Sequence, residues 1–206
     1  MLGGAEGLVN VEAALNHIRK RRLVLGGVVL SGGEPCLYEE LPALVEEIKK
    51  TGLPVKLDTN GTFPAMLENL FRREESRPDY IALDLKIAPA RYAELIPPPR
   101  LDKPALVPKD SPGEALTQSA ALIHASGIEH EYRTLALPGG FITGEDIEAL
   151  APLADNAPWH FRHFREGNCL DPAWDILADN AALSEAHAKA LVEKAISLGK
   201  TALFSA

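Results

Sequence analysis

The stretch that decides the fold runs from Gly26 to Pro35 and reads Gly-Gly-Val-Val-Leu-Ser-Gly-Gly-Glu-Pro. Its short apolar run predicts a buried strand over residues 27–31, which ends in a pair of glycines. Two adjacent glycines remove both Cβ atoms, so the backbone can lie against a ligand and bond it directly. Gly32, Gly33 and Glu34 are therefore candidate binding residues, and the Glu34 carboxylate is suited to an ammonium group.

Two further predicted strands also end in polar residues, Asp58-Thr59-Asn60-Gly61 and Asp84-Leu85-Lys86. Alternate residues of a strand point to the same face, so Asp84 and Lys86 share one face of the sheet. Glu131 and Arg133 repeat this spacing on a later strand. Because ligands of parallel βα sheets bind at the carboxyl ends of the strands, we expect these residues to line one pocket with the glycine pair.

Short apolar strands alternate with amphipathic helices along the chain, which is typical of βα units around a parallel sheet. The predicted strands begin near residues 27, 54, 79, 129 and 158, and the predicted helices lie at 10–22, 39–51, 62–71, 111–126, 143–154 and 184–198. A proline-rich insertion over 87–110, with one short turn near 89–95, interrupts this rhythm. We expect an α/β fold, a partial (βα) barrel that forms a single domain over 1–206, because the units are too few for eight strands.

By residues, spacing and order, these motifs resemble the radical S-adenosylmethionine (SAM) superfamily. They are most similar to the activating enzymes of glycyl-radical enzymes, in particular the anaerobic ribonucleoside-triphosphate reductase activating protein. The resemblance covers about residues 8–205 and implies a six-stranded partial barrel, with about five of its βα units present here. It also implies that SAM is held by Gly32, Gly33, Glu34, Asp58, Asn60, Asp84, Lys86 and Arg133.

The resemblance further implies a [4Fe–4S] cluster on a C-x3-C-x2-C loop, which this sequence lacks. Its two cysteines, Cys36 and Cys169, lie far apart, whereas three thiolates of one loop are needed to hold the cluster. We therefore expect no metal ligand and no catalytic residue in this chain, which would begin at the first helix of the barrel and be inactive as given. Cys36 is expected to be a small packed residue, and strand 27–31 an edge covered by residues 1–10 or by a second chain.

For the intact enzyme, the resemblance implies an oxidoreductase that cleaves SAM reductively and abstracts a hydrogen atom from a glycine of a partner enzyme. An anaerobic ribonucleotide reductase is the expected partner, with flavodoxin or ferredoxin as electron donor, although a pyruvate formate-lyase partner would look much the same. Two alternatives remain open. A metal-free βα-barrel lyase or aldolase would use Lys86 as a Schiff-base nucleophile beside Asp84, and a degenerate module would bind SAM or a peptide without catalysis.

The same site residues also have purely structural interpretations. Glu34 could be solvated on an ordinary turn, and Asp84 and Lys86 could be a structural ion pair. Arg133 could fork onto the SAM carboxylate or pair with Glu131.

Composition limits the function classes. The net charge of −8 argues against a nucleic-acid surface, which needs clustered lysine and arginine. The sequence has no run of 18 apolar residues, so no membrane span is expected. Two cysteines and no secretory signal predict a cytoplasmic protein.

Overall fold

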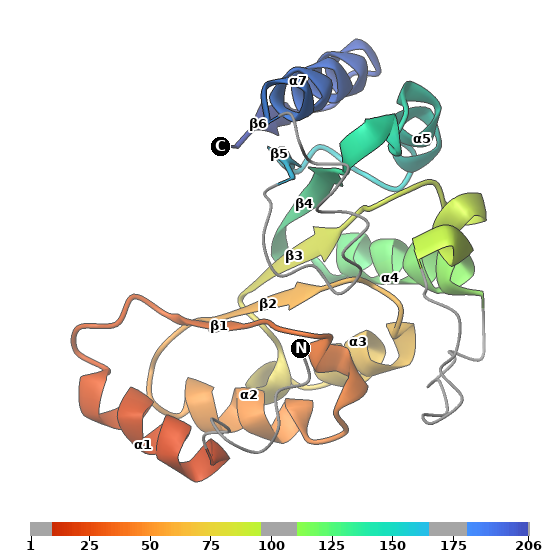
Figure 1. The fold of residues 1–206 in the computed structure, drawn as a ribbon. Helices are drawn as coiled ribbons and strands as arrows, with labels where there is room; N and C mark the ends of the chain where they lie inside the picture. Colours follow the sequence, from red (N-terminus) through yellow and green to blue (C-terminus); the bar gives the residue numbers. More distant parts are fainter. Residues whose placement is uncertain (1–9, 96–110, 165–180, 206) are drawn as a thin grey trace, which may run out of the picture.

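The computed structural model of the chain describes residues 10–95, 111–164 and 181–205, with side chains from residue 185 onward in the last range. Within these ranges six parallel strands form one sheet in chain order. They are β1 (Val28–Leu30), β2 (Val55–Thr59), β3 (Tyr80–Asp84), β4 (Glu129–Ala136), β5 (Trp159–His163) and β6 (Ala202–Phe204). Because β1 and β6 are the two edges of the described sheet, the barrel is open (Figure 1). The predicted α/β class and partial barrel are confirmed.

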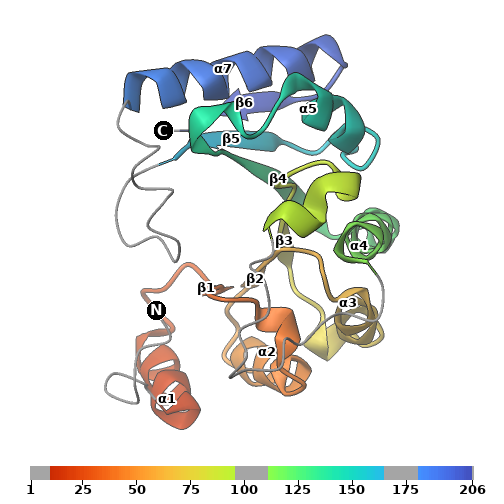
Figure 2. The same ribbon diagram turned by 45° about the vertical axis from the view of Figure 1, so that its right-hand side comes forward.

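Helices follow the strands and lie outside the curved sheet (Figures 1 and 2). They are α1 (Val11–Arg21), α2 (Leu41–Lys49), α3 (Pro64–Phe71), α4 (Pro112–Ser126), α5 (Gly144–Leu150) and α7 (Ala181–Ser197), with short 3-10 turns η1 (Pro35–Leu37), η2 (Glu74–Ser76), η3 (Pro89–Leu95) and η4 (Pro138–Gly140). The helix starts are encoded locally, since the Asn10 side chain accepts the N–H of Glu12 and Ser111 forms a capping box with Glu114. In the described ranges, no helix has the length and apolar character that a bilayer crossing requires.

The sheet has one strand more than the five that the sequence predicted. The additional strand β6 has three residues and pairs with β5 after the turn at Gly199. So short a run carries almost no periodic signal, and neighbouring strand β5 supplies the pairing that fixes it. The predicted turn near 89–95 is η3, whereas the rest of the proline-rich insertion, residues 96–110, and Cys169 lie outside the described residues.

The apolar core lies between the sheet and the helices. Strand β2 shows how the pattern arises, because Val55 and Leu57 are fully buried while Lys56 and Asp58 lie on the other face of the strand. Each fully buried side chain of this kind contributes roughly 1.5–3 kcal/mol of transfer free energy. The alternation therefore leaves a polar concave face, and the side chains at its strand ends form the candidate site.

Candidate functional site

The turn after β1 is built on its two glycines. Gly32 and Gly33 have φ angles of 96° and 54°, in the left-handed region that residues with a Cβ rarely adopt. A Cβ built on either glycine would meet no atom within 4 Å. The glycines are therefore needed for the backbone path, and the space in front of the turn is open. Within the described part of the chain, neither N–H has a hydrogen-bond partner, so both are available to a ligand.

The buried Glu34 side chain is hydrogen-bonded to two loops, and the interpretation that it is solvated is wrong. Its residue is 5% exposed. One carboxylate oxygen, Oε1, accepts the N–H of Cys36 at 3.0 Å and the Thr59 hydroxyl at 2.8 Å, and Oε2 accepts the N–H of Asn60 at 2.7 Å. A buried carboxylate needs such donors, and here they come from the loops after β1 and β2. Glu34 therefore fixes these loops relative to one another.

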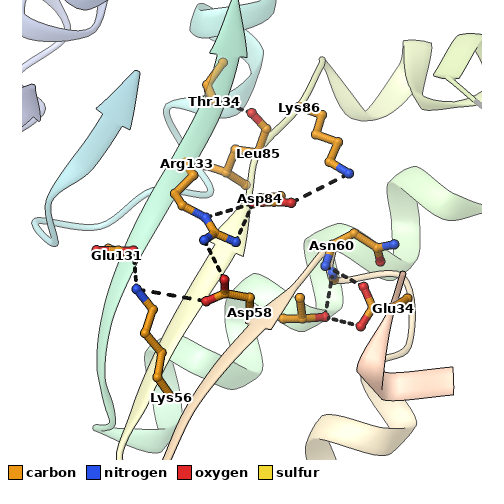
Figure 3. A network of polar contacts seen from close by, with 12 residues as sticks. Glu34, Lys56, Asp58, Asn60, Asp84, Leu85, Lys86, Glu131, Arg133 and Thr134 are labelled. Atoms are coloured by element: carbon orange, nitrogen blue, oxygen red, sulfur yellow. Dashed lines mark hydrogen bonds and ion pairs between the residues drawn. The ribbon is translucent and has the colours of Figure 1, made fainter. Parts of the chain in front are cut away.

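An arginine within β4 joins that strand to the carboxyl ends of β2 and β3 in the centre of the site (Figure 3). Arg133 of β4 donates from Nη1 to Asp58 Oδ2 at 2.8 Å, and its Nε and Nη2 lie 3.0 and 2.9 Å from Asp84 Oδ1. Burial by itself would lower the pKa of Arg133, but the Asp84 and Asp58 carboxylates together raise it above its usual value. The proposed Arg133–Glu131 pair does not form. At least two of the five guanidinium N–H groups remain for a ligand carboxylate.

Lys86 completes this cluster at its open side. Its ammonium group lies 3.6 Å from Asp84 Oδ2, and its side chain is 43% exposed, the largest value in the cluster. Leu85 between them is fully buried on the opposite face. The prediction that Asp84 and Lys86 share the concave face is confirmed, and the long contact leaves the Lys86 ammonium accessible.

A second polar row lies next to the cluster on the concave face. Glu131 accepts from Lys56 Nζ at 2.8 Å and from the Tyr80 hydroxyl at 3.2 Å, and His160 Nε2 lies 3.7 Å away. Burial opposes ionisation of Glu131, yet Lys56 holds the pKa of this carboxyl below its usual range. Burial and the Glu131 charge raise the pKa of Tyr80 to about 12. Sequence reasoning missed Lys56, although its position two residues before Asp58 places it on the same face.

One acceptor of the cluster has no partner in the structure. Asp58 Oδ1 is a buried oxygen without a hydrogen bond, and the Lys56 ammonium lies 4.0 Å from it. An ionised oxygen buried without a donor is destabilising by about 1–3 kcal/mol or more. A ligand hydroxyl or ammonium would satisfy it. The open glycine turn and this orphan acceptor fit a zwitterionic nucleoside such as SAM.

The described residues do not fit an iron–sulfur cluster. Cys36 is 3% exposed, as predicted for a packed residue. Burial, and next the charge of Glu34, raise the pKa of its thiol far above the usual range, which keeps it neutral. Among the described residues there is no group of three histidine, cysteine, aspartate or glutamate side chains placed to hold a metal ion.

Two curated proteins share part of the sequence. A protein of Methanocaldococcus jannaschii named as a glycyl-radical enzyme activating enzyme is 37% identical over 89 residues, which make up 43% of this chain and 35% of that protein. The 7-carboxy-7-deazaguanine synthase of Aquifex aeolicus is 35% identical over 54 residues, or 26% of this chain and 24% of that enzyme. The chain thus matches only about a third and a quarter of the length of these curated relatives.

Solved structures share the fold, and a family model identifies the chain. A radical SAM methyltransferase from Sphaerobacter thermophilus gives a TM-score of 0.66 at 17% identity, over 95% of this chain and 56% of that one. Streptococcus suis SuiB bound to S-adenosylmethionine gives 0.60 at 12% identity, over 97% and 43%. These identities show the fold alone. The model of the radical SAM superfamily, however, matches residues 3–154 of the sequence, and the chain therefore belongs to that superfamily.

Proposed function

We propose that this chain binds SAM at the carboxyl ends of β1 to β4 and acts in the activation of a glycyl-radical enzyme. The observation that carries the proposal is the convergence, at the carboxyl-terminal side of the sheet, of the glycine turn, which Glu34 connects to the end of β2, with the Asp58–Arg133–Asp84 cluster (Figure 3). The relative named as an activating enzyme supports the class of partner. An anaerobic ribonucleotide reductase is the partner we propose, following the family that the sequence most resembles.

Each residue has a proposed role in holding SAM. The backbone carbonyl oxygens of Gly32 and Gly33, with the Glu34 carboxylate behind them, accept from the methionyl ammonium. The remaining N–H groups of Arg133 bind the carboxylate, with Lys86 at the open side. Asp58 and Asp84 accept hydroxyl or ammonium protons, with Asp58 Oδ1 as the acceptor that is still unused. Asn60 donates from its amide nitrogen, because its Oδ1 already accepts from Thr62. These contacts orient SAM and exclude water from it.

Radical chemistry would require SAM to bind a reduced cluster, and the described residues do not fit one. The role of this chain is therefore to bind and orient SAM and to present it to a partner protein.

The alternative of a Schiff-base aldolase finds less support. Such lysines are activated by desolvation in an apolar pocket or by a second cation. Lys86 is 43% exposed and faces the Asp84 carboxylate, so neither condition is met. This function also leaves the open glycine turn unused.

Isothermal calorimetry with SAM tests the proposal, using two aspartates at opposite ends of β3 as a matched pair. Asp84→Asn removes a carboxylate from the candidate site, and we expect it to weaken SAM binding by about tenfold or more. Asp79→Asn removes a carboxylate that accepts from the N–H of Val55 at the other end of the strand, and we expect unchanged affinity. No heat of binding with the wild-type chain, or equal losses in both variants, would refute the site.

A further inference from the structure

Asp146 is a buried carboxylate outside the residues proposed to hold SAM. It lies at the start of α5 and is 1% exposed. Its Oδ2 accepts the N–H of Thr143 at 2.8 Å and the hydroxyl of the same residue at 3.1 Å, which form the cap of α5. Its two oxygens also accept from outside the helix, from the N–H of Ala88 at 3.2 Å and from Arg91 Nη1 at 2.6 Å. A helix cap alone does not use these last two contacts.

The two outside contacts act on the loop that carries Lys86. Just upstream of Lys86, the N–H of Leu85 donates to the Arg133 carbonyl at 2.8 Å, and the Leu85 carbonyl accepts the Thr134 hydroxyl at 2.5 Å. Just downstream, the N–H of Ala88 donates to Asp146 Oδ1. Lys86 therefore lies between two anchors, and Asp146 is the downstream one.

The same carboxylate reaches the loop after β2 through η3. Arg91 in η3 binds Asp146 and lies 5.2 Å from the centre of the Phe141 ring. One residue later, the hydroxyl of the buried Tyr92 donates to the Asn60 carbonyl at 3.2 Å. The N–H of Asn60 in turn donates to Glu34. A continuous series of contacts thus runs from Asp146 across the loops after β4, β3, β2 and β1.

Arg91 is held in its charged form. Its hydrogen bond to Glu94, and to a smaller extent the Asp146 charge, raise the pKa of the guanidinium. An arginine whose planar donors are shared between two carboxylates loses little further freedom when a ligand binds nearby. The contact with Asp146 is therefore suited to fixing η3 in one position.

We propose that Asp146 is a positioning residue for the SAM site, which it acts on by fixing the loop of Lys86 and, through Tyr92, the loop of Asn60. This inference rests on the proposed function for its effect on SAM, but its effect on the loops does not. Loops that are held in their binding geometry before the ligand arrives lose less conformational entropy on binding. Removing the outside contacts should weaken SAM binding without removing any group that touches SAM.

Three variants separate the positioning contacts from the helix cap. Asp146→Asn affects both sets of contacts, and Thr143→Ala affects only the cap. Arg91→Met removes the Arg91 contact, together with the pair that Arg91 forms with Glu94, and keeps the contact from Ala88. Hydrogen exchange of the ligand-free chain, resolved by mass spectrometry, reports on the segment from Leu85 to Tyr92. Calorimetry reports on the affinity for SAM.

We expect Asp146→Asn and Arg91→Met to raise exchange over this segment by about tenfold, as loss of a charged hydrogen bond implies. Both variants should weaken SAM binding by roughly tenfold, similar to the effect of outer-shell partners at metal sites. Thr143→Ala should change neither, although it should lower the free energy of unfolding. Arg91→Met keeps the buried carboxylate of Asp146 and its cap, so it remains informative if Asp146→Asn does not fold.

The outcomes that overturn the inference are distinct from those that overturn the proposed function. Thr143→Ala effects equal to those of Arg91→Met would make Asp146 a helix cap only. Unchanged exchange in both Asp146→Asn and Arg91→Met would also refute the positioning role. A wild-type chain that binds no SAM would refute the proposed function, while the exchange result would still decide whether Asp146 fixes the loops.

Discussion

Replacement of Arg133 by methionine tests whether the central cluster is organised by this one cation. Methionine keeps most of the aliphatic volume of arginine but leaves Asp58 and Asp84 with only the longer contacts to Lys56 and Lys86, at 4.0 and 3.6 Å. The side chains of Arg133, Asp58 and Asp84 are 19%, 14% and 26% exposed, so the two aspartates would remain largely desolvated in the variant. We therefore expect a substantial loss in the free energy of unfolding.

The size of the loss follows from the two ion pairs, at 2.8 and 2.9 Å. Two unit charges 4 Å apart interact by about 4 kcal/mol at an effective dielectric constant of 20, but the desolvation of the arginine offsets much of this. Breaking a fully buried pair costs about 3–5 kcal/mol, and partial exposure reduces the estimate for Arg133→Met to roughly 2–4 kcal/mol. A domain stable by about 5–15 kcal/mol would still fold.

Urea denaturation at pH 7 measures this loss. Without the guanidinium, the two carboxylates repel one another at short range. Arg133→Met combined with Asp58→Asn and Asp84→Asn should therefore recover most of the loss. A loss below about 1 kcal/mol, or a triple variant that recovers none of the loss, would contradict this account of the cluster.

Three further predictions concern other parts of the molecule. Gly61 has a φ of 73°, and a Cβ there would lie 2.7 Å from Leu83 Cδ1, whereas Gly199 has a φ of 77° and open space around it. Gly61→Ala should therefore lower the free energy of unfolding by roughly 2–3 kcal/mol, and Gly199→Ala should lower it by about 1 kcal/mol. Equal losses by urea denaturation would exclude a close approach at Gly61. The pKa of Glu131 is lowered in the fold, so its contribution to stability is present above the unfolded value near 4.3 and is lost as the pH falls through the folded value. Glu131→Gln should therefore be less stable than the wild type at pH 7, and its stability should depend less on pH below pH 4. A plot of stability against pH that is parallel to that of the wild type would disprove the assignment. The edge strand β1, whose Val29 is 57% exposed, should be paired or covered; Val29→Lys should reduce self-association in sedimentation, whereas a monomeric wild type with fast amide exchange in β1 would refute the expectation.

The sequence predicts which strand ends meet, but not which side chains pair there. Hydrophobic alternation places Asp58, Asp84 and Arg133 on one face of parallel strands, with Asp58 and Asp84 at the carboxyl ends of β2 and β3 and Arg133 within β4. The partner of Arg133 depends on lateral register instead. Glu131 is two residues away along the same strand, about 6.6 Å, whereas Asp84 lies directly opposite Arg133 on β3. Sequence spacing therefore suggests Glu131, and strand pairing selects Asp84.

The loop contacts of Asp146 likewise could not be predicted from the sequence. The pair Thr143 and Asp146 is visible in the sequence as a capping box, and the structure contains that cap. The contacts to Ala88 and Arg91 join residues 58 and 55 positions apart. No local pattern encodes them, because they arise only when the loops after β3 and β4 are brought to the same end of the sheet.

The Glu34 carboxylate combines a structural contact with a candidate ligand contact. Its sequence context suggests a ligand carboxylate, and the structure gives it three protein donors. An ionised carboxylate has about four acceptor sites, so one remains, on Oε2, toward which a ligand ammonium could be directed. A turn with two left-handed glycines has few bonds of its own and needs an anchor to keep a single conformation. The same carboxylate can therefore hold the turn in place and present the last acceptor to SAM, so a substitution at Glu34 would disturb the loop and the binding of SAM together.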